Sequence, residues 1–151
     1  MKLEALMDFT IDLGDGLDLG GGPYGNRFIG ESNGGHFEGE KLKGSIRAAG
    51  SADWLTMTED FAHLDVRATF VTHDEALIYV EYVGRLELTP AIQAALAGEG
   101  DTGFGEAYFF TTPRMQTGDP RYRWVNNIVC VARGRLLARR VEYEVFQVVN
   151  G

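Results

Sequence analysis

Apolar and polar residues alternate near the N-terminus with a period of two residues. Between positions 3 and 13 every odd-numbered residue is apolar, and the even-numbered residues are mainly charged or polar. Successive side chains of a β-strand point to opposite faces, so this pattern predicts a strand with one buried and one solvated face. The apolar side comprises Leu3, Ala5, Met7, Phe9, Ile11 and Leu13.

The same period returns along most of the chain. Between 61 and 72 the residues Leu64, Val66, Ala68 and Phe70 share one face. A polar turn follows and then a run of strong β-formers, which together predict a β-hairpin. A glycine-rich connection is predicted for residues 14–25. Strands are predicted for 27–29, 36–46, 61–72, 76–84, 107–112, 122–131 and 141–149, with a short segment at 53–57.

A single segment favours a helix. Thr89 can cap the N-terminus, Pro90 suits the first helical position, an alanine-rich body follows, and Gly98 can end the helix. About two helical turns among many short strands predict one all-β, mostly antiparallel domain spanning residues 1–151. Regularly spaced short strands of this kind form either a barrel or a sandwich.

Charge and cysteine content narrow the classes of partner and compartment. The chain carries 14 Lys and Arg against 22 Asp and Glu, a formal net charge of −8. Nucleic acids and anionic membranes require positive surface, so we expect neither as a partner.

Cys130 is the one cysteine, which excludes an intramolecular disulfide. The N-terminus lacks the apolar core of a secretory signal, and we therefore expect a cytoplasmic protein.

A polar face on the predicted 61–72 strand supplies the first candidate site. Asp65 and Arg67 lie two residues apart, so their side chains share a face with His63 and Thr69. Three interpretations are open at this point. The two charged groups form an ion pair, or Arg67 presents its guanidinium fork to a substrate carboxylate, or the whole face is solvated outer surface.

Aromatic residues beside hydrogen-bonding groups supply the second candidate site. Tyr79 and Tyr82 lie three residues apart in one predicted strand, so at most one of them points inward. Tyr108 opens a further aromatic run, and Trp124 shares a predicted strand face with Asn126. A mainly apolar face with a few polar groups is typical of a ligand pocket, although Trp124 could equally belong to the core.

Motifs of the common catalytic classes are absent. The chain contains no H-E-x-x-H zinc motif and no G-K-[ST] phosphate loop, and no G-x-S-x-G or G-x-G-x-x-G sequence in it leads from a predicted strand into a predicted helix, as a nucleophile elbow or a dinucleotide loop requires. The three histidines are not spaced as metal ligands. We therefore expect no metal and no cofactor, and we expect any chemistry to be non-redox.

Six short motifs occur in a characteristic order: Gly34-Gly35-His36-Phe37-Glu38-Gly39, Ala52-Asp53-Trp54, Leu64-Asp65-Val66-Arg67, Ile78-Tyr79-Val80-Glu81-Tyr82, Tyr108-Phe109-Phe110-Thr111-Thr112-Pro113, and Thr117 through Asn126. With these motifs the chain resembles, over almost its whole length, the bacterial and fungal family called domain of unknown function 3237. The resemblance implies a calycin-like antiparallel β-barrel, related in shape to lipocalins, whose interior can hold a small ligand.

The chain departs from the family pattern in three places, one of which is the segment Arg47-Ala48-Ala49-Gly50-Ser51, where the family has a glycine-proline stretch. Phe110 stands where the family usually has an arginine, so any role of that cation is missing here. The final hairpin carries Leu136 and Leu137 near its predicted tip. An apolar tip favours contact with a second subunit, and two-fold dimers are the commonest assembly, so we expect a homodimer.

Two functions from different classes fit these observations. The first is a cofactor-free enzyme that moves protons on a small oxygenated, carboxylated or aromatic-derived substrate, as an isomerase, tautomerase, cyclase or hydrolase. The second is a non-catalytic barrel that binds a hydrophobic ligand. A carboxyl or phenol with a perturbed pKa would favour the enzyme.

In the enzymatic hypothesis each candidate residue has a role. Arg67 binds a carboxylate or enolate oxygen, Asp65 is the base or orienting group, and Tyr79 or Tyr108 donates a proton. Asp65, Arg67, Tyr79, Tyr108, Trp124 and Asn126 are predicted to converge on one internal cavity. The residues expected to contact the ligand are Trp54, Tyr82, Trp124 and Asn126.

Overall fold

The computed structural model describes residues 1–151 and consists almost entirely of antiparallel strands. One α-helix and one 3₁₀-helix complete the secondary structure. The elements are β1 (Lys2–Gly22), β2 (Gly25–Glu38), β3 (Lys43–Ile46), β4 (Ala52–Met57), β5 (Phe61–Thr72), β6 (Leu77–Glu87), α1 (Pro90–Leu96), β7 (Phe109–Thr111), β8 (Arg114–Gln116), η1 (Arg123–Asn127), β9 (Cys130–Leu137) and β10 (Arg140–Val149).

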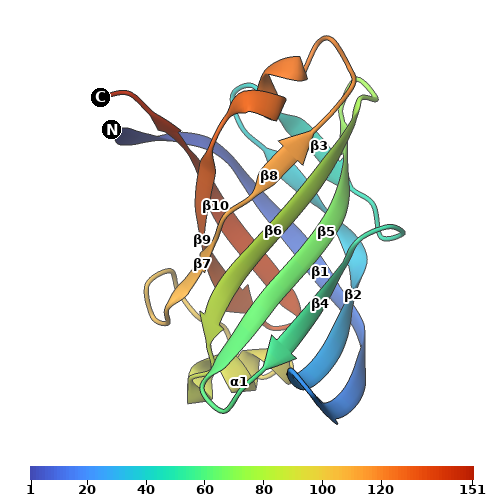
Figure 1. Cartoon of the computed structure of the whole chain (residues 1–151), viewed down its shortest axis with the longest axis vertical. Helices are drawn as coiled ribbons and strands as arrows, with labels where there is room; N and C mark the ends of the chain where they lie inside the picture. Colours follow the sequence, from blue (N-terminus) through green and yellow to red (C-terminus); the bar gives the residue numbers. More distant parts are fainter.

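The strand pairings run in a ring. Neighbours pair in the order β5–β4–β2–β1–β10–β9–β7–β6, and β6 pairs with β5 again. Figure 1 shows these strands wrapped around one interior, with α1 across one end and η1 at the other. The all-β, barrel-like fold with one short helix is therefore as predicted. A ring of about eight strands encloses just enough space for side chains or one small ligand.

The helix α1 forms where its sequence signals lie. The Thr89 hydroxyl accepts the N–H of Ile92 at 3.2 Å, and Pro90 occupies the first turn. Ile92 and Ala95 are buried against the end of the barrel, while the helix spans only seven residues. No helix in this structure has the length and apolar content needed to cross a membrane.

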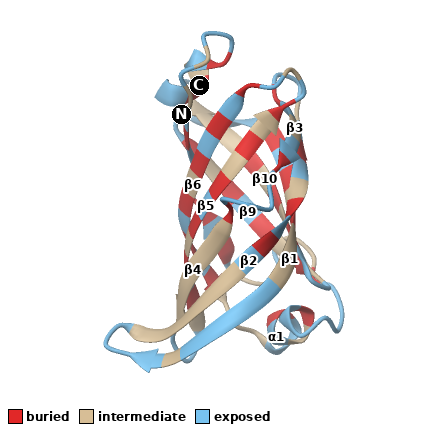
Figure 2. Ribbon diagram, turned by 90° about the vertical axis from the view of Figure 1, so that its right-hand side faces the viewer, coloured by how far each residue is buried: buried red, intermediate tan, exposed pale blue.

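The hairpin of β1 and β2 is longer than predicted. The segment expected as a glycine-rich connection pairs almost to its tip, where Gly22 lies opposite Gly25, although the register shifts between Leu13 and Gly16 and again between Asp18 and Gly20. Glycine permits the pairing because a Cβ on Gly16 would lie 2.0 Å from the ring of Phe28, which packs over the Gly16 backbone. The hairpin extends beyond the barrel at the same end as α1 (Figures 1 and 2).

The core consists of the inward-facing side of the alternating pattern. Figure 2 shows buried and exposed residues alternating along the barrel strands. Aromatic rings pack together in the barrel core. The centroid of the Phe9 ring lies 4.8 Å from that of Tyr143, in a tilted pair, and 5.3 Å from that of Phe70, in an edge-to-face pair. Such pairs add stabilisation beyond the apolar area that they bury.

The strand predicted for 122–131 is wrong over its first half. Residues 123–127 form the 3₁₀-helix η1, and the strand begins only at Cys130. The Asn126 side chain donates to the Thr117 carbonyl at 2.9 Å and accepts the Thr117 N–H at 2.8 Å. The Tyr122 hydroxyl donates to Asp74 at 2.7 Å. These side-chain hydrogen bonds replace the strand ladder that the alternation suggested.

The predicted apolar tip of the final hairpin is also wrong. Leu136 belongs to β9, faces the interior and is buried, and Leu137 is half-buried. The turn itself consists of Ala138 and Arg139, and Arg139 has a left-handed backbone with φ of 60°. The homodimer stays a prediction, without the exposed leucine pair that suggested it.

Candidate functional site

A cavity of about 520 Å³ occupies the barrel at the end covered by α1. Its size lies within the range of pockets that bind small molecules. Of its 27 lining residues 18 are hydrophobic, so the few polar groups in its wall determine what it can do chemically. The ionisable side chains in the lining are Glu31, Asp53, Tyr82, Arg139 and Tyr143.

Asp53 is a carboxyl inside this apolar wall. It lies on β4 opposite Gly30 of β2 and Val66 of β5, and Val66 faces the interior. One carboxylate oxygen accepts the backbone N–H of Asp65 at 2.9 Å. Burial raises the pKa of Asp53 to about 7, an effect that the Asp65 N–H opposes and the Asp65 charge reinforces. Near neutral pH the carboxyl therefore populates both its protonated and its ionised state.

Tyr82 and Tyr143 place two phenols in the lining of the same cavity. Their rings meet edge to face with centroids 5.3 Å apart, on β6 and β10, which lie far apart in the sequence. Burial is the main cause that raises the pKa of both hydroxyls, and the charge of Asp53 raises both pKa values further. Both phenols therefore remain protonated and serve as hydrogen-bond donors.

The buried serines of the cavity are not nucleophiles. The Ser32 hydroxyl oxygen accepts the N–H of Gly34 at 2.9 Å, and that of Ser51 accepts the N–H of Thr69 at 3.1 Å. All three histidines are exposed, so no imidazole lies among the cavity-lining residues to activate a serine. No group of three or more His, Cys, Asp or Glu side chains is placed to hold a metal ion.

The predicted polar face lies outside the barrel, so the prediction that it lines the cavity is wrong. Asp65 and Arg67 form an ion pair at 3.9 Å, with side chains about half exposed. The Arg67 guanidinium lies 5.2 Å from the centre of the Trp54 ring on the same outer face. Strand alternation buries Leu64, Val66 and Ala68. The intervening residues Asp65 and Arg67 must therefore face outward.

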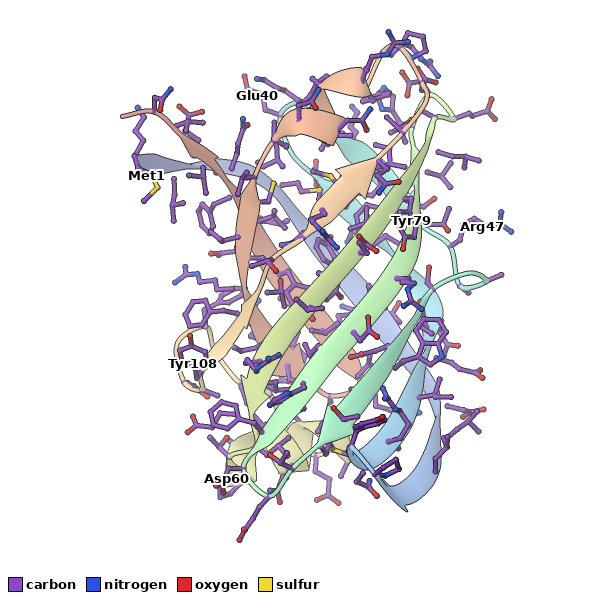
Figure 3. The ribbon with its side chains drawn as sticks, in the orientation of Figure 1. Met1, Glu40, Arg47, Asp60, Tyr79 and Tyr108 are labelled. Atoms are coloured by element: carbon purple, nitrogen blue, oxygen red, sulfur yellow. The ribbon has the colours of Figure 1, made fainter.

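The two remaining catalytic candidates are also on the outer surface. Tyr79 is exposed, and its hydroxyl donates to Glu81 at 2.8 Å. Tyr108 is 55% exposed and contacts the rings of Phe61 and Phe110. Figure 3 shows Tyr79 in the upper half of the barrel on the right and Tyr108 in the lower half on the left, so no single site contains both.

Most of the residues predicted to contact the ligand also lie outside the cavity. Tyr82 lines the cavity as predicted, and it is the one member of the predicted set of eight that does so. Trp124 and Asn126 belong to η1, at the end of the barrel opposite α1. The expected convergence on one internal cavity is therefore wrong, because the set spans both ends and both faces of the barrel wall.

Two functional groups were missed by sequence reasoning. Asp53 belongs to the Ala52-Asp53-Trp54 motif, but the predicted ligand-contact residue in that motif is Trp54. The Trp54 side chain points outward. Tyr143 lies in the alternating run with Val141 and Val145, where it resembles an ordinary core residue. The signal available for Asp53 was a lone carboxyl on the apolar side of a short strand.

Known proteins share both the sequence and the fold. UPF0311 protein RPA1785 of Rhodopseudomonas palustris is 31% identical to this chain over 150 residues, 97% of each protein. The crystal structure of RPA1785 superposes with a TM-score of 0.85 at 30% identity and covers 99% of both chains. A β-barrel-like protein from Acinetobacter baumannii, ABAYE2633, gives 0.81 at 31% identity, covering 97% of this chain and 94% of its own.

A more distant structure shares the fold alone. An enzyme from Penicillium herquei superposes with a TM-score of 0.68 at 17% identity, covering 96% of this chain and 93% of its own. The family described as Protein of unknown function (DUF3237) matches residues 1–148. The chain therefore belongs to that family, as its ordered motifs predicted.

Proposed function

We propose that the protein binds a small, mainly apolar, oxygenated molecule in the barrel cavity and transfers a proton through Asp53. The observation that carries the proposal is a half-buried carboxyl with a pKa of about 7 in the apolar wall of a cavity that two phenols also line. Perturbed carboxyls in clefts are typical of proton-transfer sites. Asp53 takes the role that the sequence assigned to Asp65.

The chemistry follows from the three groups together. An ionised Asp53 removes a proton from a carbon next to a carbonyl group, and the electron pair moves onto the carbonyl oxygen as an enolate. Tyr82 or Tyr143 donates a hydrogen bond to that oxygen as its charge develops, in a cavity whose lining is mainly apolar. The protonated Asp53 then returns the proton to the same or another carbon, which is an isomerisation or a tautomerisation.

A second function is favoured by a different observation. The lining is mainly hydrophobic, and a carrier of apolar molecules needs no more than such a cavity. In that case the buried groups only orient the ligand. The perturbed pKa of Asp53 favours the enzyme, since a carrier has no use for a carboxyl near neutrality.

Exchange of carbon-bound hydrogen for deuterium tests the proposal without knowledge of the substrate. A panel of cyclic ketones and 1,3-diketones is incubated with the protein in D₂O, and loss of the α-proton signal is followed by NMR. We expect the wild type to accelerate exchange of those members that bind, and Asp53→Asn to lose about 10²-fold or more of that rate.

The matched control is Asp60→Asn, which removes an exposed carboxylate in the β4–β5 turn (Figure 3) and should exchange like the wild type. Ligands that bind in the cavity without any Asp53-dependent exchange would instead establish the carrier. If no member of the panel binds, the proposed function is rejected.

A further inference from the structure

Arg139 is the only basic residue among the cavity-lining residues. It forms the β9–β10 turn, where its left-handed backbone, with φ of 60°, places it at the end of the barrel that α1 covers. The aliphatic part of its side chain passes Gly98, just after α1, where a Cβ on that glycine would lie 3.5 Å from Arg139 Cγ. Arg139 therefore contributes to the cavity wall at the end where α1 closes the barrel.

This guanidinium has no carboxylate partner, unlike the other arginines of its hairpin. No ion pair or hydrogen bond of the Arg139 side chain occurs within the structure. The carboxylate of Asp101, beside the turn, is engaged by the N–H of Ala138 at 2.8 Å. The three other arginines each donate through Nε to a carboxylate: Arg133 to Glu144 at 2.7 Å, Arg135 to Glu142 at 2.7 Å and Arg140 to Asp12 at 2.8 Å.

The positive charge of the unpaired Arg139 side chain is opposite in sign to the net charge of the protein. The chain has a net charge of −8, which repels organic anions from the surface in general. Glu31 also lines the cavity but makes no ion pair with Arg139. A guanidinium presents two parallel N–H donors that match a carboxylate, and it is the side chain best suited to hold one at a partly exposed rim.

We infer that Arg139 binds the carboxylate of the ligand at the cavity mouth, so that the protein takes amphipathic organic acids whose apolar body enters the barrel. This inference rests on the proposed function and specifies its substrate class. Anchoring at the rim also orients the ligand, because the acid group stays at the mouth while the rest of the molecule points toward Asp53. Arg139 is thus a specificity-determining residue in the place first expected for Arg67.

Binding of a matched acid and amide tests the inference. Isothermal titration calorimetry at pH 7.5 compares 2-naphthylacetate with the neutral 2-naphthylacetamide, which differ in charge but hardly in shape. We expect the wild type to prefer the acid, and Arg139→Gln to weaken acid binding about tenfold while leaving amide binding unchanged. Arg139→Lys should restore part of the loss, because it returns the charge without the fork.

Arg140→Gln is the matched control, since Arg140 is the next residue, pairs with Asp12 and does not line the cavity. It should bind both probes like the wild type. If Arg139→Gln binds the acid as tightly as the wild type does, or if the wild type binds acid and amide equally, the inference is overturned.

A cavity-filling variant distinguishes failure of the Arg139 inference from failure of the proposed function. Gly30 lines the cavity opposite Asp53, and a Cβ built there meets no atom within 4 Å. Gly30→Leu should therefore abolish binding of both probes, whereas Gly21→Leu in the exposed hairpin tip should not. If Gly30→Leu leaves amide binding intact, or neither probe binds the wild type, the cavity is not the binding site, and both proposals are rejected.

Discussion

Replacing Asp53 with asparagine should make the protein more stable at alkaline pH. The native carboxyl has a pKa of about 7, against 3.8 for an ordinary aspartate. Between about pH 4 and pH 7 the native state holds a proton that the unfolded chain has released, so the free energy of unfolding falls as pH rises through this window. Above pH 7 the full cost of the buried charge is present.

The magnitude follows from the size of the pKa shift. Three pH units at 1.36 kcal/mol each give about 4 kcal/mol as an upper limit. Asp53 faces a cavity that solvent can enter, so water screens part of this cost, and we expect about 2–4 kcal/mol. Asparagine keeps an oxygen that can accept the Asp65 N–H, so the variant loses the charge and retains the hydrogen bond.

Urea unfolding of the wild type and Asp53→Asn at pH 5, 6, 7 and 8 measures the effect, with tryptophan fluorescence as the signal. The difference between the two proteins isolates Asp53, because every other titrating group is common to both. We expect the variant to be the more stable protein already at pH 5, by roughly a third of the full effect, and its advantage to grow until about pH 7 and then stay level to pH 8. Asp60→Asn controls for loss of a surface carboxylate. A difference that stays constant from pH 5 to pH 8 would refute the assignment of a raised pKa to Asp53.

Three further predictions test the fold and the corrected site. Arg67→Ala should leave binding of a cavity ligand unchanged in calorimetry, since Arg67 lies on the outer face of the barrel. A large loss of affinity would show that the ligand binds on that outer face instead. Phe9→Ala should cost about 3–5 kcal/mol in urea unfolding, because the ring is fully packed, whereas the exposed Phe110→Ala should change stability by about 0.5 kcal/mol or less. Burial raises the pKa of the Cys130 thiol to about 11, so a thiol reagent at pH 8 should react slowly with the native protein and rapidly in urea, and fast native reaction would contradict the packing of β9.

The sequence by itself determined the fold class and the composition of the core. Alternation with period two separated the apolar face of the 61–72 strand from its polar face, and Thr89, Pro90 and Gly98 marked the helix. Both signals are local, because a strand or a cap expresses its preference within a few residues. The family was likewise available from the order of its motifs.

Tertiary structure decided which polar groups face the cavity. The outward direction of Asp65 and Arg67 follows from alternation once the apolar face is placed inside, whereas their polarity alone suggested a site. Asp53 faces inward because β4 lies between β2 and β5 in a register that sets it opposite Val66. The alternation of Asp53 with Leu55 and Met57 places the carboxyl on the apolar side of the strand, but the register depends on pairings between strands that six residues of sequence do not specify.

The ends of the barrel were the least predictable parts from sequence. Arg139 acquires its position from the turn it forms and from α1, which begins about fifty residues earlier in the chain. Tyr82 and Tyr143 become one site only because ring closure brings β6 and β10 around the same interior. A sequence pattern reports which face of an element is apolar, while the long-range contacts that assemble a site exist only in the folded barrel.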